Sequence, residues 1–176
     1  MAVYKPIVLV EDEKHDVEMT LFALKRLHVV NEIVVMRDGA EACDYLLGKG
    51  KYEGRAKTPQ LVLLDLKLPK VDGLEILRYL REEPRTKATP VVVFTSSSEE
   101  QDIIRSYNLG ANCFIRKPVE IGAFLSAVRQ LGLFWLELNE APPGLPAAAQ
   151  SEPVYRALMS QLGTGSSKDL MSTPAA

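Results

Sequence analysis

The chain has 176 residues, of which 47% are hydrophobic and 25% are charged, and this composition excludes a disordered, collagen-like or coiled-coil protein. Its formal charge of −2 at pH 7 argues against electrostatic binding of nucleic acid or of anionic lipid. The length predicts one domain followed by a short remainder.

The cysteines and the N-terminus indicate a compartment. Cys43 and Cys113 belong to no CxxC or Cys/His cluster, and isolated thiols are typical of a reducing compartment. The apolar run at 7–10 is too short for a signal peptide or a membrane-spanning helix. We therefore expect a soluble, cytoplasmic protein that contacts no membrane.

Short apolar runs alternate with longer segments of helical period, five times along the chain. Strands are expected at 7–10, 33–36, 61–64, 91–95 and 113–115, and helices begin near Lys14, Asp38, Asp72, Ser98 and Glu120. The runs are almost continuously apolar, as parallel strands covered by helices must be. The pattern predicts an α/β fold of the doubly wound (βα)5 kind. With five strands, the flavodoxin-like order 2-1-3-4-5 is favoured over the longer Rossmann order.

Reactive side chains follow four of these strands, at the sheet edge where such folds bind ligands. Glu11 and Asp12 follow the first strand, Asp65 the third, Thr95 the fourth and Lys117 the fifth. Carboxylates that share a crevice raise each other's pKa unless a cation is present, and Mg²⁺ suits Asp12 and Asp65 as ligands. The Lys117 ammonium and the Thr95 hydroxyl suit a phosphoryl ligand. A carboxylate in this setting can be the nucleophile that forms an aspartyl phosphate.

Taken singly, most of these residues have an ordinary structural explanation. The acidic run at 11–13 can stabilise the start of the following helix, Thr95 can be a strand-end hydroxyl, and Lys117 a solvated lysine. Asp65 is harder to explain in this way, because a carboxylate that ends an apolar strand is costly unless it is paired. The combination at four strand ends is what indicates a site.

The stretches IVLVEDE, LVLLDLKLPKVDGLEIL, PVVVFTSSS and GANCFIRKP resemble the receiver domain of two-component response regulators, over about residues 4–138. The resemblance implies that Asp65 is the phospho-acceptor, that a histidine kinase is the donor, and that Mg²⁺ is the cofactor. It also implies that Asp12 and Asp65 ligate the metal directly, Glu11 through water, and Lys67 through its backbone carbonyl. Such a protein signals and is not an enzyme, beyond promoting its own phosphorylation and dephosphorylation.

The same resemblance assigns the groups that respond to phosphorylation. Thr95 is the switch hydroxyl and Lys117 the phosphoryl-binding lysine, while Phe114 stands at the aromatic switch position, where many relatives have tyrosine. The peptide bond before Pro118 is expected to be cis, which would aim Lys117 at the site. Movement of Thr95 and Phe114 is expected to repack the surface of the fourth helix, fifth strand and fifth helix.

A narrower resemblance points to small stand-alone receivers paired with phytochrome histidine kinases. It rests on VEDEKHDVEMT, YEGRAKTPQLVLLDL, DIIRSYNLGANCFIRKP and the terminal FWLEL. In that subgroup the terminal segment contributes to dimerisation.

The apolar pattern of the last expected helix, at about 120–138, agrees with a dimer. One stripe that the sheet can cover consists of Phe124, Val128, Leu131, Trp135 and Leu138. Other faces carry Leu133, Phe134 and Leu136, and large exposed apolar patches are rare in monomers. We therefore expect a two-fold dimer through the fourth helix, fifth strand and fifth helix, with a cover formed by the chain's own tail as the alternative. The interface candidates are Leu133, Phe134, Trp135 and Leu136.

The composition changes after the receiver-like part, which is expected to span 1–138. Residues 139–176 have the pattern of a Pro/Ala-rich linker and tail, with a possible short amphipathic helix at 152–162. Alone, so short a helix is marginal. This remainder is too short and too poor in basic residues for a DNA-binding output domain, so the expected output is contact with an unknown downstream protein.

Two other classes of protein share parts of this pattern. A haloacid-dehalogenase-type phosphatase also uses a strand-end aspartyl nucleophile. That family has the motif DxD, however, and in this chain Lys67 stands in place of the second aspartate. A flavodoxin-like FMN protein would need a phosphate loop rich in Ser, Thr and Gly after the first strand, where this chain has EDEKHD.

Overall fold

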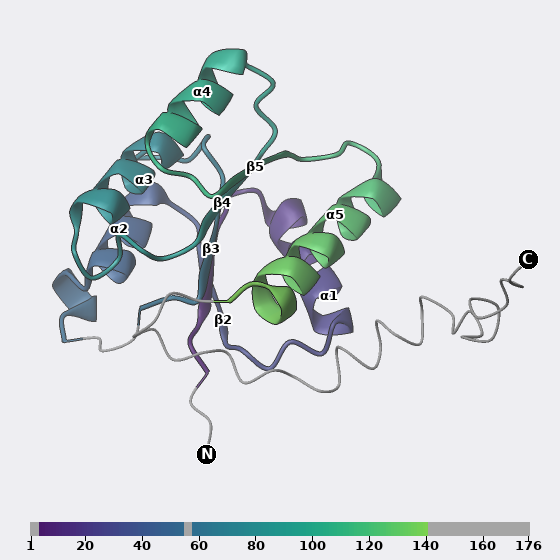
Figure 1. Cartoon of the computed structure of the whole chain (residues 1–176), viewed down its shortest axis with the longest axis horizontal. Coiled ribbons are helices and arrows are strands. Elements are labelled where there is room, and N and C mark those ends of the chain that lie inside the picture. The colour runs from purple at the N-terminus through teal and green to yellow at the C-terminus, as the bar shows by residue number, and fades with distance from the viewer. Residues whose placement is uncertain (1–3, 55–57, 141–176) are drawn as a thin grey trace, which may run out of the picture.

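The computed structural model describes residues 4–54 and 58–140, which form one parallel sheet with helices on both faces (Figure 1). The strands are β1 (Ile7–Val10), β2 (Ile33–Met36), β3 (Leu61–Leu64), β4 (Val91–Thr95) and β5 (Cys113–Arg116). The helices are α1 (Lys14–Arg26), α2 (Gly39–Leu47), η1 (Gly50–Tyr52), α3 (Gly73–Glu82), α4 (Glu100–Asn108), α5 (Ile121–Leu133) and η2 (Phe134–Leu138). The helix expected at 152–162 lies outside the described residues.

The sheet has the strand order β2-β1-β3-β4-β5, with every pairing parallel. This confirms the flavodoxin-like order predicted from the sequence. In the three central strands β1, β3 and β4 every residue is buried, because helices cover both faces of the sheet. The near-continuous apolar runs of the sequence follow from this double covering.

Successive residues of each strand face opposite layers of the fold. Val8 and Val62 belong to a core cluster that includes side chains of α2 and α3, whereas Leu9 and Leu63 pack with side chains of α1 and α5. In Figure 1 the helices α1 and α5 lie on one side of the sheet, and α2, α3 and α4 lie on the other. Because all the strands are parallel, they end at the same edge of the sheet, between the two helical layers.

Acidic residues cap two of the helices that begin at that edge. Asp38 Oδ1 accepts a hydrogen bond from the amide of Glu41 at 2.8 Å, and Asp72 Oδ1 accepts one from the amide of Glu75 at 2.9 Å. Gly73 is required for another reason. A Cβ at this position would lie 2.2 Å from the carbonyl oxygen of Asp65, so only glycine lets α3 begin so close to the end of β3.

The end of the last helix differs from the predicted regular stripe. Residues Phe134–Leu138 form a π-helical turn, closed by a 2.8 Å hydrogen bond from the Asn139 amide to the Phe134 carbonyl. The wider turn rotates the side chains that follow it. Leu138, expected in the covered stripe, is 61% exposed, whereas Leu136, expected on another face, is 8% exposed. Leu136 is therefore part of this chain's core and not a surface candidate for an interface.

By length and composition alone, the segment Ile121–Leu138 could span a membrane, with a mean hydropathy of 1.3. In the fold, however, it is the helical layer beside α1. Its side chains Phe124, Val128 and Leu131 are buried in the core. The high hydropathy thus combines this buried face with apolar residues on the surface, among them Ile121 and Phe134.

Helix α4 is the least embedded of the α-helices in the part of the chain that the structure describes. Its only buried residue is Ser106, whereas Ile104 is 58% and Tyr107 50% exposed. Little apolar area therefore anchors α4 to the sheet, so its position can change at modest cost in buried surface.

Candidate functional site

The predicted acceptor Asp65 lies directly after β3 and is almost completely buried. Its Oδ1 accepts hydrogen bonds of 2.6 Å from the Thr95 hydroxyl and 2.6 Å from the Leu66 amide. Its Oδ2 lies 2.6 Å from the Lys117 ammonium. The ends of β3, β4 and β5 thus bring together three groups from the sequence prediction. The carboxylate is held in one orientation from both oxygens.

Lys117 is the cationic centre of the site. Its Nζ lies 2.5 Å from Glu11 Oε2 and 2.8 Å from Asp16 Oδ2, in addition to Asp65. The lysine side chain is 6% exposed. The ammonium donates hydrogen bonds to Glu11 and Asp65 and forms an ion pair with Asp16. The structure therefore places Glu11 beside Lys117 and adds one carboxylate, Asp16, that sequence reasoning missed.

A signal for Asp16 was present in the sequence. It lies four residues after Asp12, in the first turn of α1, and a helix that starts just beyond β1 keeps its first turn at the same sheet edge. A carboxylate there also interacts favourably with the helix dipole. Asp16 lies beyond the acidic run at 11–13, and the position of the run after the first strand therefore does not point to it.

The site carries more carboxylates than cationic side chains, which favours the binding of a further cation. Burial raises the pKa of Glu11 to about 7, against the opposing hydrogen bond from Lys117. Burial alone would lower the pKa of Lys117, but its contacts with the Asp16, Asp65 and Glu11 carboxylates raise it overall. The carboxylates of Glu11, Asp16 and Asp65 surround this one ammonium, so the cluster is negatively charged when they are ionised.

Three carboxylates are placed to hold a metal ion. Glu11, Asp12 and Asp65 each offer one oxygen, and these atoms lie within 4.8 Å of one another. An all-oxygen set rich in carboxylate fits a hard divalent cation such as Mg²⁺ or Mn²⁺. The residues therefore fit the metal that the receiver resemblance implies. The Lys67 amide donates to Asp65 Oδ1 at 3.2 Å, which places its backbone at the site, while the ligand role of its carbonyl stays a prediction.

The hydroxyl of Thr95, the predicted switch group, is connected to α4 through Ser97. The Ser97 amide donates to Thr95 Oγ1 at 3.3 Å, and the Ser97 hydroxyl donates to Asp102 Oδ2 at 2.5 Å. Because Asp102 belongs to α4, a displacement of Thr95 has a direct path to that helix. Phe114 lies on β5, partly buried against the core cluster on the α2 and α3 side of the sheet.

The predicted cis peptide before Pro118 was wrong. The described residues contain no cis peptide bond, so the Lys117–Pro118 bond is trans. The trans form is favoured by about 0.5–1 kcal/mol for a bond before proline. It already brings Lys117 Nζ within 2.6 Å of Asp65 Oδ2, so the lysine reaches the site without the cis form.

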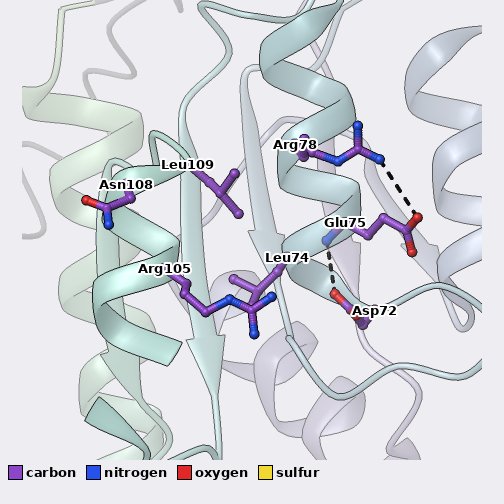
Figure 2. A pocket seen from close by; sticks show the side chains of 7 residues that line it. All are labelled: Asp72, Leu74, Glu75, Arg78, Arg105, Asn108 and Leu109. Atoms are coloured by element: carbon purple, nitrogen blue, oxygen red, sulfur yellow. Dashed lines mark hydrogen bonds and ion pairs between the residues drawn. The ribbon is translucent and has the colours of Figure 1, made fainter. Parts of the chain in front are cut away.

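A groove of about 460 Å³ lies between α3 and α4, away from the carboxylate site (Figure 2). The charged groups along α3 are largely paired with one another. Asp72 caps α3, and Arg78 lies 3.9 Å from Glu75 and 2.9 Å from Glu82. On the α3 side of the groove the charged groups are therefore already engaged with one another. Its lining consists of Asp72, Leu74, Glu75, Arg78, Arg105, Asn108 and Leu109.

The fold and the site define the class of protein. Residues 7–129 match the response regulator receiver domain family, and the chain belongs to this family. The haloacid-dehalogenase alternative is accordingly not favoured.

Some members of this family are similar to this chain over most of its length. Response regulator Rcp1 of Synechocystis sp. strain PCC 6803 is 40% identical over 138 residues, covering 78% of this chain and 93% of Rcp1. The crystal structure of the phosphorylated cyanobacterial phytochrome response regulator RcpA is similar, with a TM-score of 0.76 and 41% identity. The match covers 80% of this chain and 99% of that chain. The Mn²⁺-bound form of Rcp1 has a TM-score of 0.75 at 40% identity, covering 78% and 99% of the two chains.

Proposed function

We propose that this chain is a single-domain response regulator that accepts a phosphoryl group on Asp65 from a phytochrome-type histidine kinase. The observation that carries the proposal is the setting of Asp65. One of its oxygens is bonded to the Thr95 hydroxyl and the other to the Lys117 ammonium, each at 2.6 Å. These are the two kinds of group that bind the outer oxygens of a phosphoryl group in transfer. The likeness to Rcp1 and RcpA supports the choice of kinase.

In the proposed reaction a carboxylate oxygen of Asp65 attacks the phosphorus of a kinase phosphohistidine. The new O–P bond forms as the N–P bond breaks, and the electron pair of the N–P bond returns to the imidazole nitrogen. Lys117 and Thr95 hold the outer phosphoryl oxygens. Asp12 and Asp65, the Lys67 carbonyl, and Glu11 through water would hold Mg²⁺, which supplies charge neutralisation when bound. Self-catalysed phosphorylation and hydrolysis are then the only turnover of the protein.

The proposed output is a change in the surface of α4, β5 and α5. When Thr95 turns from Asp65 to the phosphoryl group, its contact with the Ser97 amide is disturbed, and α4 follows through Asp102. Phe114 enters the space that Thr95 leaves. Because α4 has a single buried residue and exposes Ile104 and Tyr107, this surface suits a protein partner whose binding depends on phosphorylation.

We also propose that the protein is a homodimer through this face and acts in the cytoplasm, without contacting nucleic acid or membrane. Phe134 is 49% exposed, and its ring meets that of Trp135 edge-on at 5.0 Å. Such aromatic pairs are typical anchors of interfaces. Substitution of Trp135 with Ala is expected to lower the solution mass measured by light scattering. A shortened chain of residues 1–138 should keep the dimer mass if the proposed receiver boundary holds and 139–176 is only linker and tail.

The direct test of the proposed function is phosphotransfer with Mg²⁺, from acetyl phosphate and from purified phytochrome-type and unrelated kinases. Intact-mass spectrometry and peptide mapping should locate one phosphoryl group on Asp65. The Asp65→Asn variant should stay unmodified. Equal mass addition to Asp65→Asn, or none to the wild type from any donor, would contradict the proposal. Selective transfer from an unrelated kinase would leave the receiver function standing and remove the phytochrome pairing.

A further inference from the structure

The Asp16 carboxylate has no part in the reaction described above, yet it shares the central lysine. Its Oδ2 lies 2.8 Å from Lys117 Nζ. It is not the acceptor, and it is not among the three carboxylates grouped closely enough to hold a metal ion. Its position in the first turn of α1 means that it approaches the ammonium from a different element than Glu11 and Asp65 do.

Three carboxylates surround the Lys117 ammonium in this arrangement. It donates hydrogen bonds to Glu11 and Asp65 and forms an ion pair with Asp16. A phosphoryl oxygen on Asp65 that approaches Lys117 therefore competes with these carboxylates for the ammonium. Asp65 remains in place because it carries the phosphoryl group.

The choice between the other two partners follows from burial. The Glu11 side chain is 3% exposed, whereas the Asp16 side chain is 22% exposed. A carboxylate that loses its cation in a buried position pays a desolvation cost that water cannot offset. Asp16 can be hydrated when the lysine leaves it, so its ion pair is the easiest of the three to break.

We propose that Asp16 is a positioning residue that holds Lys117 while Asp65 is unphosphorylated and competes with the phosphoryl group for the ammonium. This inference rests on the proposed function. It assigns to α1 a share in setting how strongly the site favours its phosphorylated state. Removal of the Asp16 charge removes a competitor for the ammonium and lowers the repulsion toward an incoming dianion. The phosphorylated state is therefore stabilised relative to the unphosphorylated one.

The test is the affinity for beryllofluoride, a phosphoryl mimic, measured with Mg²⁺ by Trp135 fluorescence or calorimetry. Asp16→Asn keeps the size of the side chain and removes its charge, and we expect it to tighten binding about 1.5- to fivefold, the range for a partly exposed charge contact. Glu18→Gln is the matched control. It removes the same charge from the same helix. Within residues 4–54 and 58–140, Glu18 pairs only with the exposed Lys14, at 3.7 Å, so the affinity of this variant should equal that of the wild type.

A second readout reports on the lysine itself in the metal-free protein. The ¹H–¹⁵N signal of the Lys117 ammonium should shift and exchange faster with water in Asp16→Asn, and should not change in Glu18→Gln. Wild-type affinity in Asp16→Asn, weaker binding, or an unchanged ammonium signal would overturn the inference and leave the phospho-acceptor function intact. A wild type that binds no beryllofluoride would instead overturn the proposed function, and the inference with it.

Discussion

The hydroxyl of Thr95 lies 2.6 Å from Oδ1 of Asp65, although the two residues are 30 positions apart in the chain, and both are buried. The predicted switch residue is thus bonded to the predicted acceptor itself. A change in the chemistry of this carboxylate must break or redirect that bond. The next contact, from the Ser97 amide to Thr95 Oγ1, carries the change toward α4.

Replacement of Thr95 with Ala is expected to uncouple α4 from the acceptor. The loss of two buried hydrogen bonds, to Asp65 and from the Ser97 amide, should lower the free energy of unfolding by about 1–3 kcal/mol, measured by urea denaturation. Beryllofluoride should then cause much smaller amide shifts in α4 than it does in the wild type. Thr95→Ser retains the hydroxyl and should restore most of the shifts. Full α4 shifts in Thr95→Ala would show that the signal takes another path.

Removal of the Lys117 ammonium should be strongly destabilising without metal. Lys117→Ala leaves Glu11 and Asp65 buried without their shared cation, and breaking a buried ion pair costs about 3–5 kcal/mol. The free energy of unfolding should recover in part with Mg²⁺, which supplies positive charge to the same carboxylates. The control is Lys14→Ala, since the Lys14 side chain is 78% exposed and its one ion pair among the described residues is with Glu18. If the free energy of unfolding fell as little in Lys117→Ala as in the control, the arrangement around Lys117 would be contradicted.

Gly73 is expected to tolerate no side chain, because its added Cβ would meet backbone. Gly73→Ala places a methyl group 2.2 Å from the Asp65 carbonyl oxygen and 2.7 Å from Leu66 Cα. Displacing that backbone should cost about 1–3 kcal/mol and weaken beryllofluoride binding. At Gly132 the nearest atom is the end of the Leu27 side chain, at 2.7 Å, which can rotate away. Gly132→Ala should therefore cost less, and the reverse order in denaturation midpoints would refute this account.

The thiol of Cys43 is expected to resist alkylation at pH 8. Burial raises its pKa to about 11, with a smaller contribution from the Glu75 charge. A raised pKa means that less thiolate is present below it. At pH 8 the thiolate fraction is then on the order of 0.001, against roughly a quarter for a free cysteine. Labelling with iodoacetamide, followed by peptide mass spectrometry, should be on the order of 100-fold slower than in urea-unfolded protein. Labelling at the unfolded rate would contradict the buried environment.

The sequence alone was sufficient for the strand order and for most of the site. Runs such as 7–10 and 61–64 are apolar throughout, and this is the pattern of strands covered on both faces. Parallel strands joined by helices end at one edge, so Glu11, Asp65, Thr95 and Lys117 could be placed together from their positions after the strands. The motifs around Asp65 then pointed to the receiver family, which the matched residues 7–129 show.

The tertiary structure decided which atoms meet and how the last helix ends. Lys117 reaches Glu11 across 106 positions of the chain, and its third partner, Asp16, comes from a helix whose first turn happens to face the ammonium. The trans bond before Pro118 and the π-turn that buries Leu136 in place of Leu138 are likewise absent from any local pattern. Periodicity and propensity describe each element by itself, whereas these features depend on the free energy of contacts between elements.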